Sequence, residues 1–297
     1  MSLNWGISDM CNRNRAVAAC AFGLLVLIHG STAHAWWAEG HQLCTRVAVA
    51  KLPDDMPEFF RKGVVELAEA SAEPDNWKHI TAPHLKATEG PEHYIDLEYL
   101  EGTPLPAQRF DLIKFYVSKN VDLGKGGFLP YAIQEGYEKL MLAFRDYRNH
   151  PDAPAVRQRV LVYAGLLAHY CEDASMPLHT TKLFDGKPGP NGEAPLPPKK
   201  GIHARIDAYP EKNFTADVLG ESLKAEGAPN VWPEIVKAIE TSHTFVEKCY
   251  EIDEQGGFDK EPAKARDLML ERSRAGVKLT LDVWYSAWIN SEKVILK

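Results

Sequence analysis

Six segments of the chain repeat apolar residues at helical spacing, and this periodicity constrains the fold more than any other feature. The segments are 40–52, 56–72, 129–150, 152–176, 232–252 and 262–291. Alternating Val/Ile-rich runs, which are typical of β-strands, are scarce. We therefore expect one all-α globular domain of several helices, with two long Pro/Gly-rich loops at roughly 98–128 and 180–202.

Residues 1–35 have the three-part pattern of a secretory signal peptide: a polar basic start, an apolar run over 16–29, and small residues at Ala33 and Ala35. The apolar run is shorter than the roughly 20 residues that a membrane-spanning helix needs, although an uncleaved anchor stays an alternative. We predict cleavage after Ala35, a mature domain over 36–297 without a transmembrane segment, and a secreted or periplasmic location.

Charge and cysteine content exclude some classes of protein. The formal net charge of −7 argues against a general nucleic-acid coat protein, and bound divalent metals would offset much of it. Cys44, Cys171 and Cys249 would remain after cleavage. Three cysteines allow at most one intrachain disulfide, and we expect buried thiols.

Histidine and aspartate pairs mark a candidate metal site. His169 and Asp173 are four residues apart in the fourth periodic segment and so share one helix face. His179 follows shortly after, and His203 and Asp207 again lie four apart. Imidazole with carboxylate is a ligand set that suits Zn²⁺ and its neighbours. A single pair of this kind is more often a surface pair or a core histidine, but two pairs with a histidine between them favour metal.

Four further candidates precede these pairs. Asp75 and His93 alone would be an ordinary turn residue and a half-buried histidine. A new N-terminus at Trp36 would create an α-amino group that can bind a metal through its nitrogen and the carbonyl oxygen of the same residue. His41 would then lie in the first helical turn, within reach of the same ion. The alternative is that Trp36 and Trp37 are simply core or interface aromatics.

The complete set resembles the trinuclear zinc superfamily, which contains the secreted single-strand-specific nucleases of the S-one/P-one type and the bacterial zinc phospholipases C. The residues that carry the resemblance are, in order, Trp36, His41, Asp75, His93, His169, Asp173, His179, His203 and Asp207. The resemblance spans nearly the whole predicted mature chain and implies a multi-helix domain with three zinc ions in a cleft.

The family pattern also implies which residues would hold each ion. The first ion would be held by Asp75, His93, His169 and Asp173. The second would be held by His179, His203 and Asp207. The third would be held by Trp36 through its amine and carbonyl, by His41, and by Asp173, which would bridge two ions.

Several details favour the nuclease branch. Asp207 stands where the phospholipases typically have Glu, and Asn76 stands where they have a choline-binding Tyr. The interval of 24 residues between His179 and His203 also resembles the nuclease spacing. Against this, the fungal cysteine pattern is missing and the segment between His93 and His169 is longer than in the fungal enzymes.

Tyr94 and Asp96 match in type the residues that hold a base in the nucleases, although the phospholipases share the Asp. A base stacked on Tyr94 is available only in a single strand, which predicts a preference for single-stranded DNA or RNA.

The resemblance implies phosphodiester hydrolysis by a metal-activated hydroxide, with Asp75 orienting the nucleophile and Asp173 shared between ions. We expect a monomeric endonuclease that leaves 5′-phosphorylated products. One alternative is a zinc phospholipase C, for which the aromatics of 109–117 and the 180–202 loop would supply an apolar rim. A second alternative is a secreted helical binding protein with structural metals, but structural zinc sites are usually closed and four-coordinate.

Overall fold

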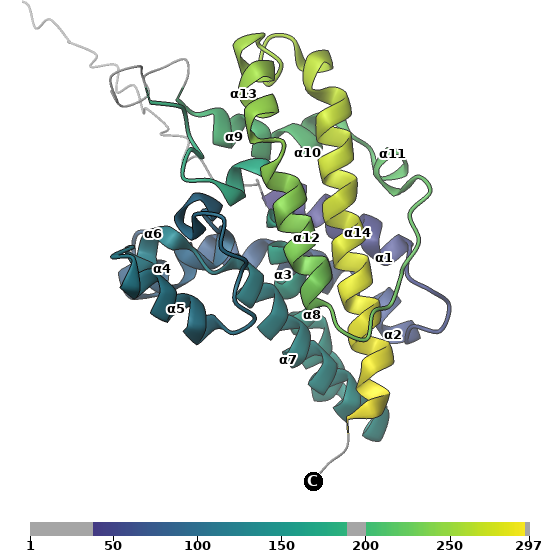
Figure 1. Ribbon diagram of the computed structural model, residues 1–297. Coiled ribbons are helices and arrows are strands. Elements are labelled where there is room, and N and C mark those ends of the chain that lie inside the picture. The colour runs from purple at the N-terminus through teal and green to yellow at the C-terminus, as the bar shows by residue number, and fades with distance from the viewer. Residues whose placement is uncertain (1–37, 189–199, 295–297) are drawn as a thin grey trace, which may run out of the picture. The chain divides into compact units, whose positions relative to one another are not determined.

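The periodic segments form helices, and these account for most of the residues that the structure describes (Figure 1). The structure is a computed structural model that describes residues 38–188 and 200–294. Its α-helices are α1 (Ala38–Ala50), α2 (Glu58–Lys62), α3 (Val64–Trp77), α4 (Pro83–Glu89), α5 (Arg109–Ser118), α6 (Leu123–Gly126), α7 (Leu129–Asn149), α8 (Pro154–Asp173), α9 (Ile202–Asp207), α10 (Tyr209–Asn213), α11 (Ala216–Gly220), α12 (Trp232–His243), α13 (Val246–Glu254) and α14 (Arg266–Asn290). Its 3₁₀ helices are η1 (Gly90–His93), η2 (Leu97–Leu100), η3 (Pro177–Thr180), η4 (Pro262–Ala265) and η5 (Ser291–Lys293).

The predicted all-α class is confirmed. The described residues contain no β-strand, and their β-type pairing is one isolated bridge between Ile95 and Gly127. They belong to one compact unit, Ala33–Lys297. Among the helices described, none is both long and apolar enough to cross a bilayer. The predicted signal peptide at 1–35 and residues 189–199 of the second predicted loop lie outside the described residues.

The prediction of a long loop at roughly 98–128 is wrong. This stretch contains η2, α5 and α6. In α5 the two buried residues, Leu112 and Tyr116, are one turn apart, while Phe110 and Val117 are exposed. The helix is short and turns only a narrow face inward, so its apolar residues do not form the wide stripe by which a helix is recognised in a sequence.

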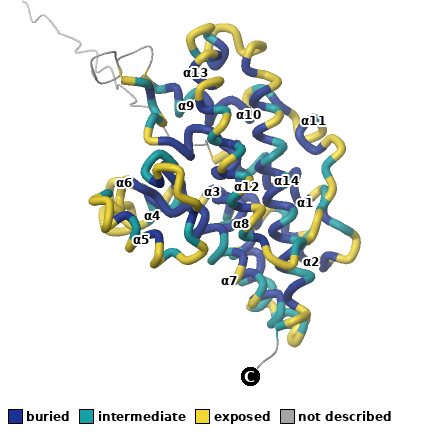
Figure 2. The backbone as a smooth tube through the Cα atoms, viewed as in Figure 1, coloured by how far each residue is buried: buried dark blue, intermediate teal, exposed yellow. Residues whose placement is uncertain are grey.

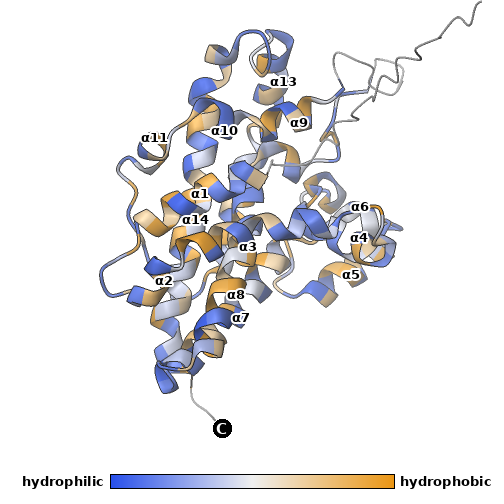
Figure 3. Cartoon of the chain, turned by 180° about the vertical axis from the view of Figure 1, so that it is seen from behind, coloured by the Kyte–Doolittle hydropathy of each residue, from blue (hydrophilic) through white to orange (hydrophobic). Residues whose placement is uncertain are grey.

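Helix α8 is surrounded by other helices. It packs against α3 and α7 over much of its length and also against α1, α2 and α14. Its buried residues begin at Val160 and recur as far as Asp173, among them Leu167 and Cys171, whereas residues 154–159 include none (Figure 2). Figure 3 colours the ribbon of this helix by the hydropathy of its residues, seen from behind. A helix enclosed in this way carries its last turn, where His169 and Asp173 lie, into the interior.

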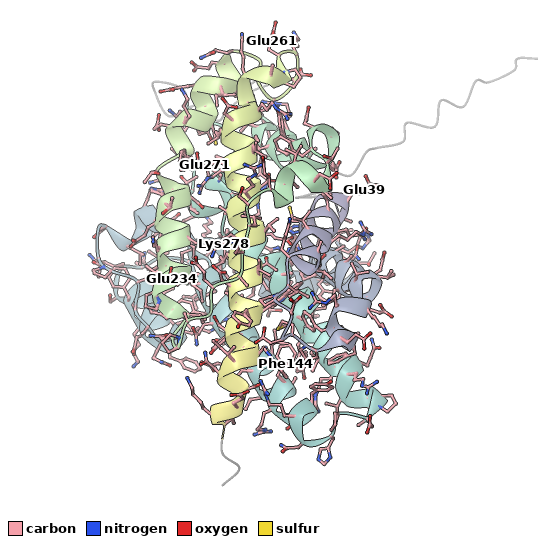
Figure 4. All side chains as sticks on the ribbon, turned by 90° about the vertical axis from the view of Figure 1, so that its right-hand side faces the viewer. Glu39, Phe144, Glu234, Glu261, Glu271 and Lys278 are labelled. Atoms are coloured by element: carbon pink, nitrogen blue, oxygen red, sulfur yellow. The ribbon has the colours of Figure 1, made fainter. Side chains whose placement is uncertain are left out.

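The long helix α14 lies between α1 and α12, with Lys278 near the middle of its length (Figure 4). Trp284 on this helix is fully buried and donates its indole N–H to Ala164 O of α8 at 3.0 Å. The three described cysteines are buried free thiols, as expected; they are Cys44 in α1, Cys171 in α8 and Cys249 in α13.

Gly165 sets the spacing between α3 and α8. A methyl group on its Cα would lie 2.5 Å from Ala70 Cβ and 2.7 Å from Leu67 O. Both neighbours belong to α3 and cannot rotate away. Because His169 is one turn further along α8, this close approach lets its ring reach the α3 backbone, where Nδ1 lies 2.8 Å from Ser71 O.

We predict that Gly165→Ala destabilises the protein by about 1–3 kcal/mol, since the added methyl must push two packed helices apart. Urea unfolding of the purified protein measures this. Gly136→Ala is the matched control, because the new methyl would meet only the end of the Leu167 side chain, at 3.0 Å. Equal stability of the two variants would contradict the close-approach argument.

Candidate metal centre

The last turn of α8 supplies the centre of the site. His169 Nε2 lies 3.3 Å from Asp173 Oδ2, as their spacing of four residues predicts. Both side chains are buried, with exposed fractions of 0% and 1%. Because His169 Nδ1 donates to Ser71 O, the lone pair of the neutral ring is on Nε2, facing Asp173.

A first group of ligand atoms forms around Asp173 Oδ2. His93, at the end of η1, brings its Nδ1 to 3.1 Å from this oxygen and to 2.9 Å from His169 Nε2. Asp75, in the last turn of α3, places Oδ1 3.8 Å from each of the two ring nitrogens. Four acceptor atoms therefore converge on one small volume.

The other oxygen of Asp173 faces α1. His41 Nε2 lies 3.7 Å from Asp173 Oδ1, and the His41 ring stacks on His169 with 3.9 Å between centroids. The second nitrogen of His41, Nδ1, lies 2.6 Å from Glu172 Oε2. Asp173 thus presents one oxygen to each of two histidine groups.

A third group joins η3 to α9. His179 donates Nδ1–H to His93 O at 2.8 Å, and its Nε2 lies 3.8 Å from Asp207 Oδ1. His203 Nε2 lies 2.9 Å from Asp207 Oδ2, at the end of α9. His203 is the more exposed member, at 21% of its side chain.

The separations fit zinc. In a tetrahedral shell with metal–ligand bonds of about 2.0–2.1 Å, neighbouring ligand atoms are about 3.3 Å apart. The distances within the first group, 2.9–3.8 Å, bracket this value. In addition, the buried Nε2 of His179 has no hydrogen-bond partner among the described residues, as expected of a nitrogen that awaits a metal ion. These residues could hold a metal ion.

Burial and the close approach of acids and imidazoles shift the pKa values of the groups in the cluster. Burial alone would raise the pKa of Asp173, but His179 and His169 outweigh it and hold this pKa well below its ordinary value. Burial would lower the pKa of His179, but Asp173 and Asp207 raise it to about 9. Burial and the neighbouring His169 hold the pKa of His41 well below its ordinary value. Without metal, a protonated imidazole such as that of His179 therefore offsets part of the negative charge of the carboxylates.

A pocket of about 440 Å³ opens beside the cluster. Its lining includes His93, His179 and His203 together with Tyr94 and Asp96. The structure thus brings both of the predicted base-holding residues to the same pocket as three of the candidate ligands.

Local contacts hold Tyr94 and Asp96 in place. Tyr94 donates its hydroxyl to Gly124 O at 2.6 Å. Gly127 has φ +81°, and a methyl group on it would lie 2.2 Å from Tyr94 O, so the chain can pass this close only as glycine. Burial and the nearby Glu98 raise the pKa of the Asp96 carboxyl to about 7.

Eight of the nine predicted ligands meet in these three groups. They are His41, Asp75, His93, His169, Asp173, His179, His203 and Asp207. The ninth, Trp36, lies outside the described residues.

Sequence reasoning missed two neighbours of the cluster. Lys78 Nζ lies 2.6 Å from Asp75 Oδ1 and 3.4 Å from His93 Nδ1. Its position one turn after Asp75 could have suggested it. Glu172 precedes Asp173 and was overlooked because adjacent helix residues normally face different sides. In this helix both sides are enclosed.

Comparisons with known proteins find a distant structural likeness. No protein-family model matches the chain, and no curated protein matches it. Twelve chains of solved structures match. One is the alpha toxin from Clostridium absonum, with 11% identity, a TM-score of 0.41, and coverage of 89% of this chain and 66% of the toxin. Another is the Clostridium perfringens alpha-toxin from avian strain SWCP, with 12% identity, a TM-score of 0.42, and coverage of 88% and 65%.

This protein therefore spans just under two thirds of the length of those toxins. The identities and TM-scores are too low to support an inference about activity.

We predict that Asp173→Asn removes zinc from both groups that meet at this residue, because an amide offers one oxygen and no charge. Asp207→Asn, the matched change in the third group, should affect that group alone. Zinc content per chain, measured by atomic emission after dialysis, distinguishes the two variants. An Asp173→Asn protein that kept its full zinc complement would contradict the bridging role.

We also predict that the metal-free protein loses stability as pH rises from about 6.5 toward 9. The pKa of His179 is about 9 in the folded state against 6.5 for the free side chain, so protonation favours the fold. This contribution is complete below pH 6.5 and is lost as pH rises through 9. Denaturant unfolding in EDTA tests it. A stability that rises over this range would contradict the assignment, and His179→Asn should flatten the slope.

Proposed function

We propose that this protein is a secreted zinc-dependent phosphodiesterase, and most specifically an endonuclease that cleaves single-stranded DNA or RNA to 5′-phosphorylated products. The observation that carries the proposal is the convergence of eight His and Asp side chains, seven of them buried, into three ligand groups. Two of these groups reach one open pocket, through His93 and through His179 and His203. Structural zinc sites are closed by four ligands each, whereas shared ligands beside a pocket suit an ion that also meets substrate.

Zinc ions bound in these groups would supply a water that is acidic enough to attack at neutral pH, and positive charge for the leaving oxygen. The chain's own residues would arrange the reaction. Asp75 orients the attacking water through the carboxylate that faces His93 and His169. Lys78, paired with that carboxylate, places a partly buried ammonium group in the lining of the pocket, where it could attract a phosphate.

The rim of the pocket favours a polyanion. Lys78, Lys125 and Lys182 all contribute to its lining. Three ammonium groups attract successive phosphates of a nucleic acid and oppose the quaternary ammonium of phosphocholine. Tyr94 supplies a surface on which a splayed base can stack. Asp96, at 7% exposure, can accept from or donate to the edge of that base.

One observation favours a phospholipid substrate instead. Tyr94, Tyr99 and Phe184 lie in the same pocket lining as the Asp96 carboxyl, and Phe184 is 53% exposed. Aromatic faces with a carboxylate form a suitable cage for a quaternary ammonium. Zinc phospholipase C is therefore the second candidate, with the lysines as the argument against it.

The deciding experiment assays zinc-loaded protein that begins at Trp36 on single-stranded DNA, duplex DNA, RNA and phosphatidylcholine vesicles, each with and without EDTA. We expect chelator-sensitive release of 5′-mononucleotides from single strands and little cleavage of lipid. Cleavage of phosphatidylcholine alone would replace the nuclease by the phospholipase, and failure on every substrate would refute the phosphodiesterase.

We predict that the Lys125→Gln, Lys182→Gln double variant raises KM for single-stranded DNA. Each lysine that contacts a phosphate should add about 0.7 to the slope of log affinity against log salt, so the double variant should lose about 1.4. The control carries Lys237→Gln and Lys248→Gln, the same charge change on exposed residues of α12 and α13. Equal salt slopes in the two variants would contradict a phosphate-binding rim.

A further inference from the structure

Glu172 is a buried acid that none of the proposed chemical steps uses. Its side chain has no solvent exposure and lies next to the shared Asp173 at the end of α8. Both of its oxygens are engaged by α1: Oε2 lies 2.6 Å from His41 Nδ1, and Oε1 accepts the Thr45 hydroxyl at 3.0 Å. His41 and Thr45 are one helical turn apart, so a single carboxylate holds one face of α1.

Burying a carboxylate this deeply costs folding free energy. We therefore expect the acid to make an interaction that an apolar residue cannot make. Burial of an ionised acid disfavours folding unless its partners compensate for the hydration that it loses. Backbone packing closes the site further: a methyl group on Gly276 of α14 would lie only 3.2 Å from Glu172 Cα. An aliphatic side chain would fill the same space without that cost, so packing alone does not account for the acid.

The His41–Glu172 contact differs from the contacts of the other histidine rings in the type of hydrogen-bond partner. The rear nitrogen of His169 is hydrogen-bonded to Ser71 O, and that of His179 to His93 O. These partners are neutral backbone carbonyls. His93 Nε2 does face an acid, but it lies 3.6 Å from Glu89 Oε1, beyond hydrogen-bond distance. At His41 the partner is the carboxyl group of Glu172. Once a cation on the ring favours its ionised form, this group makes a stronger hydrogen bond than a carbonyl and raises the basicity of the ring as a metal ligand.

The stronger hydrogen bond belongs to His41, which would bind the ion that has fewer side-chain ligands than the first ion. In the proposed arrangement the first ion has four side-chain ligands, whereas the ion at His41 has two, His41 and Asp173. A proton fixed on Nδ1 of His41 leaves Nε2 as the lone-pair atom, and Nε2 is the nitrogen that lies 3.7 Å from Asp173 Oδ1. Two adjacent acids therefore meet the two nitrogens of one imidazole.

We propose that Glu172 is a positioning residue of the metal centre. It accepts Nδ1–H of His41, fixes the tautomer and direction of that ring, and so secures the ion shared by His41 and Asp173. The inference rests on the zinc centre of the proposed function, but it concerns the binding of one ion and not the reaction.

The test compares zinc binding by wild type, Glu172→Gln and Glu172→Ala, with Glu271→Gln as a control at a half-exposed acid of α14. The protein is the processed chain beginning at Trp36. Zinc per chain is measured at a series of buffered free-zinc concentrations, and the Tm of each EDTA-treated form is recorded beside it. Neither measurement depends on enzymatic activity.

We expect Glu172→Gln to weaken the most weakly bound ion by about 10- to 100-fold, because the amide can still accept from Nδ1–H but carries no charge. Glu172→Ala should lose one ion per chain, while Glu271→Gln should match wild type. If Glu172→Ala does not fold, the isosteric Glu172→Gln decides the question.

Glu172 variants that bind every ion with wild-type affinity and lose only Tm in EDTA would make the residue a structural one and overturn the inference. A wild-type protein that binds fewer than three ions would instead contradict the proposed zinc centre. Thr45→Val offers a further comparison: it leaves the His41 contact intact, so a loss of affinity equal to that of Glu172→Gln would also count against the inference.

Discussion

The arrangement of the interior depends on one carboxylate whose two oxygens face different neighbours. Asp173 meets His93 and His169 through Oδ2 and His41 through Oδ1. An isolated charge at 1% exposure would be very unfavourable, so positive charge has to gather around it. In the metal-free protein, protonated imidazoles supply that charge. Divalent cations would supply more of it, and the acceptor atoms already lie at the separations that a tetrahedral ion requires.

Much of this site could be predicted from the sequence because its strongest signals are local. His169 with Asp173 and His203 with Asp207 lie four apart, and helix geometry alone puts each pair on one face. The order of the remaining ligands along the chain matched a known pattern. The six periodic segments likewise identified the long helices, although 56–72 divides into α2 and α3 and 232–252 into α12 and α13.

The parts that sequence reasoning missed depend on contacts between distant segments. The helix α5 buries only a narrow face, so its pattern is too weak to distinguish it from a loop. The bond from His179 to the His93 carbonyl joins residues 86 apart and has no local signature. Glu172 gains its role from the position of α1, more than a hundred residues earlier, and tertiary packing of that kind leaves no trace in the spacing of neighbours.

Metal ions bound to the candidate ligands would also act on the chain as a whole. They come from α1, α3, η1, α8, η3 and α9, while the three described thiols stay unlinked in the core. A cation shared between α1 and α8 would close a loop of more than a hundred residues. In the chain-entropy estimate for covalent cross-links, a loop of that length corresponds to about 4–5 kcal/mol. Removal of zinc by a chelator would then destabilise this protein as reduction destabilises a disulfide-rich one, because both remove cross-links. The supply of zinc would therefore determine the lifetime of the folded protein.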